Sequence, residues 1–128
     1  MKNRAHDWLS QAENDFLWAK ETRQNGRFAQ TCFICQQLSE KAIKSVAYSR
    51  GFEMIKSHSI SEIAKNLNIN GDIEKIAKRL DMYYISSRYP DAFPSGAPFQ
   101  YFSDEQAAEA IGFAEIILAY SKKEVHGK

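Results

Sequence analysis

Polar side chains with the spacing of one helix face occur in the segment 28–48, which contains no glycine or proline. Gln37, Glu40 and Lys44 follow Phe33 at intervals of three and four residues, so a helix here would carry them in one stripe. Glu40 precedes Lys44 by four residues, the order that favours a helical ion pair worth roughly 0.2–0.5 kcal/mol. Two interpretations stay open: a solvated helix face, or a polar seam that faces a cleft or a second subunit.

A second polar group occupies positions 81–91. Asp81 and Tyr84 lie three residues apart, on the same helix face as Arg88. They form either a polar site or a hydrogen-bonded seam that sets the register of the bundle. The planar guanidinium of Arg88 could hold a phosphate. It could instead pair with Asp81, Asp91 or Glu40 and fix the end of the helix.

His58 and several aromatic residues also admit two interpretations each. His58 precedes a predicted helix start, where it could meet an anion together with free backbone amides, or only cap and pack. Tyr89, Phe93 and Tyr101 lie in a segment with all three prolines, and could stack a base or fill a core or interface.

Cys32 and Cys35 form a C-x-x-C pair in the middle of the predicted helix over 28–48. No second cysteine pair and no histidine at zinc-finger spacing accompany them. We therefore expect buried, reduced thiols that behave as small hydrophobic residues, and assign no metal and no cofactor.

The 128 residues are 44% hydrophobic and 26% charged, the balance of one soluble globular domain over 1–128. The formal net charge of +1 excludes a global attraction to nucleic acid or anionic lipid. The first seven residues do not lead into the apolar run of a signal peptide, and no stretch approaches the ~20 apolar residues of a membrane span. With two unpaired cysteines, this predicts a cytoplasmic protein.

Hydrophobic periodicity and punctuation predict helices over 4–24, 28–50, 72–87 and 103–122. Ser59 with Glu62, and Ser103 with Gln106, have capping-box spacing, which adds a short helix after Ser59. We expect an irregular segment over 88–102 and a frayed tail over 124–128. The fold class predicted is all-α: an antiparallel up-and-down four-helix bundle with one additional short helix.

Four motifs in order make the chain resemble the HEPN domain family over nearly its whole length. The quoted residues are Trp8, Ala12, Asp15, Phe16 and Ala19, then Gln36-Gln37-Leu38-Ser39-Glu40-Lys41-Ala42-Ile43-Lys44, then His58-Ser59-Ile60, and last Leu80-Asp81 with Tyr83-Tyr84 leading to Arg88-Tyr89-Pro90-Asp91. They are similar to the family's W…A..D(L/F)..A, Q-x-x-x-E-K-x-x-K, H-S-(I/L) and L-D-x-x-Y…RYPD. The resemblance implies a bundle that often pairs into a two-fold dimer, with the polar helix faces meeting across a cleft. It also implies a minimal nucleotidyltransferase partner in a toxin–antitoxin-like pair.

The ribonuclease members of that family use an arginine followed, four to six residues later, by a histidine. Such a histidine acts as acid or base on RNA while the arginine steadies the phosphate. Arg88 matches the arginine, but no histidine stands in the window after it. The resemblance therefore favours a nucleotide-binding or partner-binding module with a ligand or partner cleft, and carries over no catalytic residue beyond Arg88. The assigned cleft residues are Gln37, Glu40, Lys44, His58, Asp81, Tyr84, Arg88, Tyr89 and Asp91. The alternatives are a diverged metal-independent endoribonuclease whose base is His58 or Asp91, and a purely structural dimer.

Overall fold

The computed structural model describes residues 3–127, and in this part of the chain every regular element is a helix. The elements are α1 (Ala5–Gln24), α2 (Phe28–Ser49), α3 (Ile60–Asn66), α4 (Asp72–Asp81), α5 (Tyr83–Ser86) and α6 (Asp104–His126), with 3-10 turns η1 (Pro90–Ala92) and η2 (Pro98–Gln100). This confirms the all-α class and the up-and-down bundle with a short extra helix.

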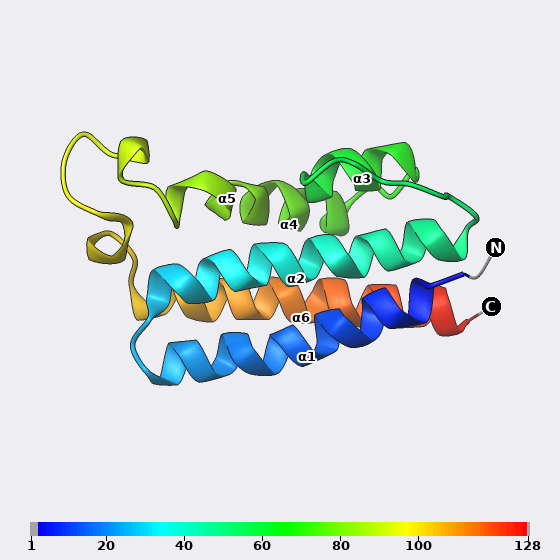
Figure 1. Ribbon diagram of the computed structural model, residues 1–128, viewed down its shortest axis with the longest axis horizontal. Helices are drawn as coiled ribbons and strands as arrows, with labels where there is room; N and C mark the ends of the chain where they lie inside the picture. Colours follow the sequence, from blue (N-terminus) through cyan, green and yellow to red (C-terminus); the bar gives the residue numbers. More distant parts are fainter. Residues whose placement is uncertain (1–2, 128) are drawn as a thin grey trace.

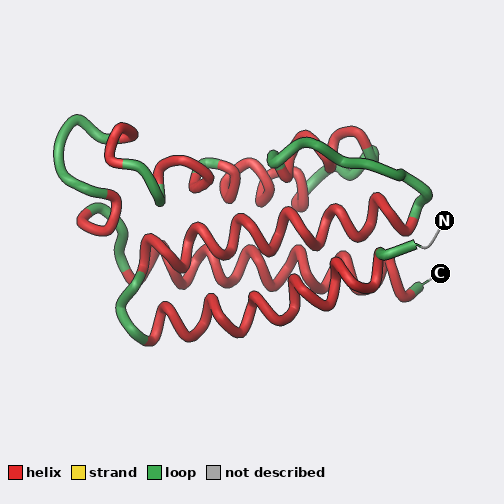
Figure 2. The backbone as a smooth tube through the Cα atoms, viewed as in Figure 1, coloured by secondary structure: helices red, strands yellow, loops and turns green. Residues whose placement is uncertain are grey.

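The centre of the bundle is the pair α2 and α6, which run in the same direction and pack together along their length (Figure 1). Helix α1 packs against both of them from one side, and α4 packs against both from the other. In Figure 1, α1 and the α3–α5 segment lie on opposite sides of α2, so α2 and α6 form the short diagonal of a flattened bundle. The loops gather at the two ends of the long helices (Figure 2).

Side-chain caps fix the starts of α3 and α6, and a glycine follows the end of α2. The Ser59 hydroxyl accepts a hydrogen bond from the Glu62 amide at the start of α3, and Ser103 and Gln106 form a complete capping box at the start of α6. After α2, Gly51 takes φ of 97°, a left-handed conformation that glycine adopts without steric cost.

Helix α2 is buried on most of its surface because it has neighbours on three sides. Its core side chains include Cys32, Cys35, Leu38 and Ile43, all without solvent exposure. Both cysteines are free thiols, and burial raises the pKa of Cys32 to about 12 and also raises that of Cys35. The interpretation of this pair as buried thiols is confirmed.

Two boundaries differ from the sequence-based expectation. The helix predicted over 72–87 is interrupted after Asp81, although Met82 keeps helical dihedral angles, so α5 continues the path of α4. The last helix runs to His126 instead of ending at Lys122, so the expectation of a frayed tail from Glu124 is wrong for residues 124–126. Val125 is buried and Glu124 pairs with Arg50 at 2.9 Å, and these contacts hold the last turn in place. Lys128 lies outside the described residues.

None of the helices within residues 3–127 combines the length and apolar content needed to cross a membrane.

Candidate functional site

The Glu40–Lys44 pair on α2 is a buried ion pair. Lys44 Nζ lies 2.8 Å from Glu40 Oε2, and each side chain is only 6% exposed. The ammonium also lies 5.6 Å from the centre of the Trp8 ring on α1. The solvated-face interpretation is therefore wrong for these two residues, and the ion pair within a polar seam is present.

His58 connects this buried pair to the surface. Its Nδ1 lies 3.4 Å from Glu40 Oε2, and its side chain is 60% exposed. Its ring stacks on that of Tyr84 in α5, with the ring centres 5.8 Å apart and the planes 12° apart. The His58 carbonyl accepts a hydrogen bond from Gln36 Nε2 at 3.0 Å. The second carboxylate oxygen, Glu40 Oε1, is buried without a hydrogen-bond partner among the described residues. The carboxylate thus has one oxygen shared by Lys44 and His58 and one oxygen unused.

Asp81 is committed to the start of α3. Its carboxylate accepts hydrogen bonds from the backbone amides of Ile60 (2.8 Å) and Ser61 (2.9 Å) and from the hydroxyls of Ser59 (3.0 Å) and Ser61 (2.8 Å). Gln36 Nε2 adds a longer contact of 3.3 Å from α2. These donors on two elements favour the hydrogen-bonded seam over a free polar site for this residue.

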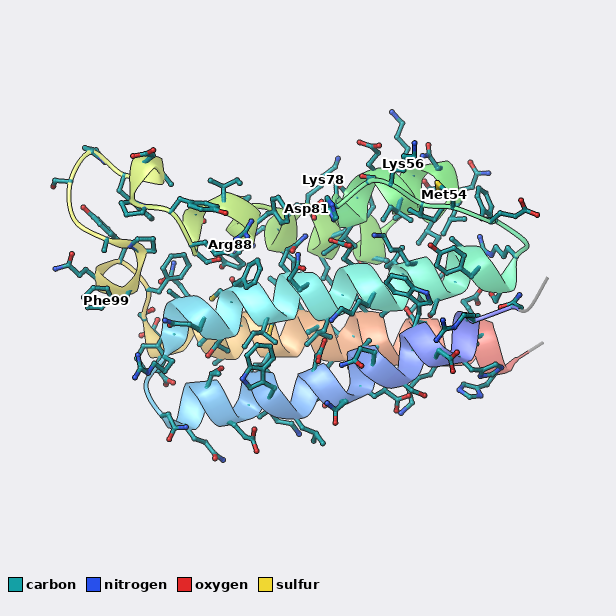
Figure 3. The ribbon with its side chains drawn as sticks, viewed as in Figure 1. Met54, Lys56, Lys78, Asp81, Arg88 and Phe99 are labelled. Atoms are coloured by element: carbon teal, nitrogen blue, oxygen red, sulfur yellow. The ribbon has the colours of Figure 1, made fainter. Side chains whose placement is uncertain are left out.

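Arg88 lies against aromatic rings. Its guanidinium carbon is 4.4 Å from the centre of the Phe33 ring, 4.7 Å from that of Tyr84 and 4.8 Å from that of Tyr89, and its Nε donates to the Tyr84 carbonyl at 2.9 Å. Asp81 and Arg88 both extend from the α4–α5 segment toward α2 (Figure 3).

Of the two alternatives for Arg88, the pairing with Asp81, Asp91 or Glu40 is absent, since Arg88 has no ion pair with any carboxylate in residues 3–127. The Asp81 carboxylate accepts hydrogen bonds from donors at the start of α3, and the Glu40 carboxylate accepts one from the Lys44 ammonium. Asp91 is exposed on η1. The terminal Nη groups of Arg88 remain without a hydrogen bond inside the described chain.

The remaining predicted residues divide between the site and its surroundings. Gln37 is half-buried on α2 and donates to Gln36 Oε1 at 2.7 Å. Tyr89 is 48% exposed beside Arg88, so it borders the site. Asp91 makes no hydrogen bond or ion pair with the other site residues among those described, and the structure does not bring it into the group.

Phe93 and Tyr101 stack on each other, with ring centres 4.2 Å apart and planes 5° apart. The Tyr101 hydroxyl also donates to the Ser95 carbonyl. One face of each ring is thus already covered, which favours packing of the 88–102 segment on itself over base stacking.

Two contributors were absent from the predicted site. Gln36 has no solvent exposure and bridges His58 and Asp81, and Phe33 supplies a ring under Arg88. Gln36 had a detectable signal: it lies four residues after Cys32 and seven before Ile43, so it is a polar residue on an apolar helix face. A buried amide requires partners from another element.

The assembled group can bind an anion. The Arg88 guanidinium has no counter-ion in the described chain and lies 4.4–4.8 Å from three ring centres, one of which is Tyr84. Tyr84 in turn stacks on His58. The guanidinium is suited to planar recognition of phosphate or carboxylate oxygens. His58 presents a ring that a buried carboxylate orients through Nδ1.

The family model of the HEPN domain matches residues 5–125 of this chain. The chain belongs to the HEPN family. Two solved structures are similar to this HEPN domain over almost their whole length. TT1696 from Thermus thermophilus is 35% identical with a TM-score of 0.90, covering 96% of this chain and 99% of that one. ST0689, an archaeal HEPN homologue, is 38% identical with a TM-score of 0.84, and the match covers 98% of this chain and 99% of that one.

A more distant relative carries a functional name. The Methanocaldococcus jannaschii protein named "Putative toxin MJ1304" is 25% identical to this HEPN domain over 136 residues, which cover 94% of this chain and 89% of that protein. The similarity relates this HEPN domain to a protein that is named as a toxin.

Proposed function

We propose that this HEPN protein is a homodimeric, cytoplasmic module of one domain over 1–128 that binds a nucleotide at the surface around Arg88. It acts with a minimal nucleotidyltransferase partner in a toxin–antitoxin-like pair. The observation that carries the proposal is the guanidinium of Arg88, which faces three aromatic rings and no carboxylate of the described chain. A nucleotide phosphate is the natural counter-ion for such a group.

In the proposed homodimer, the two copies meet through the outer surface of α2. Phe33, Gln37 and Lys41 are only half-buried there. Tyr89 is exposed beside Arg88, whose guanidinium also lies over the Phe33 ring. Aromatic rings and arginine at a surface are typical of protein interfaces. The relative from Methanocaldococcus jannaschii is named as a toxin, which supports a two-component system in which a second protein restrains or modifies this one.

The nucleotide-binding proposal is tested by calorimetric titration with AMP, ADP, ATP and inorganic phosphate. Arg88→Ala should raise Kd about tenfold or more, because it removes charge-assisted hydrogen bonds. Arg79→Ala is the matched control: Arg79 also lies over a ring, 5.4 Å from Phe113, but Glu109 already neutralises it at 2.7 Å. Equal affinity of wild type and Arg88→Ala, or no binding of any of the four, contradicts the proposal.

The partner proposal is tested by co-expression with the product of the neighbouring open reading frame, followed by co-purification and a growth assay. A nucleotidyltransferase that co-purifies and relieves growth arrest is the expected result. Absence of both the complex and the growth effect contradicts it.

The second candidate is a metal-independent endoribonuclease, and the contact between His58 Nδ1 and Glu40 favours it. This contact leaves the other ring nitrogen to act as acid or base, while Arg88 steadies the phosphate. RNA cleavage in EDTA should then be lost in His58→Gln and in Arg88→Ala, and kept in Arg79→Ala. Asp91→Asn tests the other candidate base. A purified wild-type protein that is inert on RNA rules this candidate out.

A further inference from the structure

Two histidines far apart in sequence meet at the end of the bundle opposite the 88–102 loop. His6 lies in the first turn of α1, and His126 is the last residue of α6. The start of α1 and the end of α6 lie side by side in Figure 1. The two ring centres are 5.0 Å apart, with the planes at 65°.

This separation matches that of two imidazoles bound to one metal ion. Zn–N bonds are about 2.0–2.1 Å long and the ring centre lies about 1 Å beyond the nitrogen, so two imidazoles on one tetrahedral ion have centres about 5 Å apart. A tilt of 65° between the rings is compatible with this arrangement, because each ring can rotate about its own metal–nitrogen bond.

The nitrogens of both rings are available. His6 and His126 are exposed, and neither ring forms a hydrogen bond or ion pair with another residue in the described chain. His126 also lies in the last turn of α6, where the backbone carbonyl dipoles favour a bound cation.

We propose that His6 and His126 form a two-imidazole site for a borderline divalent cation such as Zn²⁺, Cu²⁺ or Ni²⁺. Imidazole suits these ions, whereas Mg²⁺ and Ca²⁺ prefer oxygen ligands. In residues 3–127 no group of three or more His, Cys, Asp or Glu side chains could hold a metal, so solvent or an external ligand completes the coordination. The bound ion links the start of α1 to the end of α6, independently of the Arg88 site.

The test is thermal unfolding of untagged protein with and without ZnCl₂. The ion binds the folded pair and should raise Tm by about 2–5 °C at saturation, and MgCl₂ should have no effect. His6→Asn and His126→Asn should each abolish the Zn²⁺ shift, because one imidazole alone holds the ion weakly. His58→Asn, which removes the third histidine, should keep the shift. All three variants change exposed side chains, and their Tm without metal verifies that they fold.

Electron paramagnetic resonance of the protein with one equivalent of Cu²⁺ provides an independent measurement. Hyperfine structure from two imidazole nitrogens in wild type, and from one or none in each single variant, is the expected result. The proposal is overturned by a Zn²⁺ shift that persists in the double variant His6→Asn/His126→Asn, by single variants that each keep half of that shift, or by a Cu²⁺ spectrum with one nitrogen in wild type.

Discussion

Arg88 illustrates how a charged side chain can be held in place and still remain available. Contacts with aromatic faces contribute about 0.5–2 kcal/mol each, depending on solvent exposure, and they leave the charge unneutralised. Arg79, which pairs with Glu109, lacks that property. Because the rings of Phe33, Tyr84 and Tyr89 come from α2, α5 and the residue before η1, the position of Arg88 depends on the packing of these elements.

Asp81→Asn should lower the free energy of unfolding by about 2–3 kcal/mol, because an amide group replaces one acceptor oxygen and faces the donors of α3. Urea unfolding at pH 7 measures the change. Asp72→Asn, at an exposed position in the first turn of α4, is the control and should cost much less. A loss below about 0.5 kcal/mol in Asp81→Asn would mean that the carboxylate does not hold α3.

Lys44→Met should destabilise the fold by about 3–5 kcal/mol, because it leaves the Glu40 carboxylate buried and without its ammonium partner. The double variant Glu40→Gln/Lys44→Met removes both charges and should recover most of the loss. Chemical denaturation of the two variants gives the comparison. If the single variant is as stable as wild type, the pair is solvated in solution and the seam is not closed.

At the scale of elements, glycines have opposite roles at the end of α2 and inside α6. Gly51 is left-handed with φ of 97°, whereas Gly112 lies mid-helix with open space around an added Cβ. Gly51→Ala should cost about 1–2 kcal/mol. Gly112→Ala should stabilise α6 by about 0.5–1 kcal/mol. Thermal unfolding distinguishes them, and the same sign of change in both variants would contradict this assignment.

The buried thiols of α2 should make stability fall in alkali. Unfolded thiols ionise near a pKa of 9.0, whereas burial raises the pKa of Cys32 to about 12, so the folded state keeps protons that the unfolded state loses. The contribution of the protonated Cys32 thiol to the free energy of unfolding is complete below pH 9 and decreases as pH rises toward 12. Cys32→Ala should therefore show a shallower decline between about pH 9 and 10.5 than wild type in urea unfolding. Parallel declines would mean that Cys32 is accessible to solvent.

At the scale of the whole molecule, the flattened bundle leaves one surface of its most buried helix open. Helix α2 packs against α1, α6 and the α3–α5 segment, and Phe33, Gln37 and Lys41, four residues apart on one helix face, stay half-buried. We propose that a second copy of the chain covers this surface, because Phe33 on it lies under the Arg88 guanidinium at 4.4 Å.

The dimer proposal predicts that Tm rises with protein concentration, because association stabilises the folded state by mass action. Gln37→Lys adds a positive charge to each copy at the proposed interface and should remove that dependence, because like charges repel. Light scattering coupled to size exclusion should then report a monomer. A wild-type protein that is monomeric at high concentration would contradict the dimer.

The amino-acid sequence by itself determined the helices and the family. Helix formation depends on residues within a few positions of each other, so periodicity, capping pairs such as Ser103 with Gln106, and the order Glu40 before Lys44 were sufficient to predict it. The four ordered motifs likewise indicated the HEPN family, which the family match then showed.

Only the tertiary structure decided which polar groups are used and which are free. Asp81 caps a helix that begins at Ile60, Arg88 meets a ring from α2, and His6 meets His126, and each contact joins residues remote in the chain. The last turn of α6 also depends on contacts with other helices, since Val125 is buried and Glu124 pairs with Arg50. Such contacts follow from which helices lie side by side, and local periodicity carries no information about that choice.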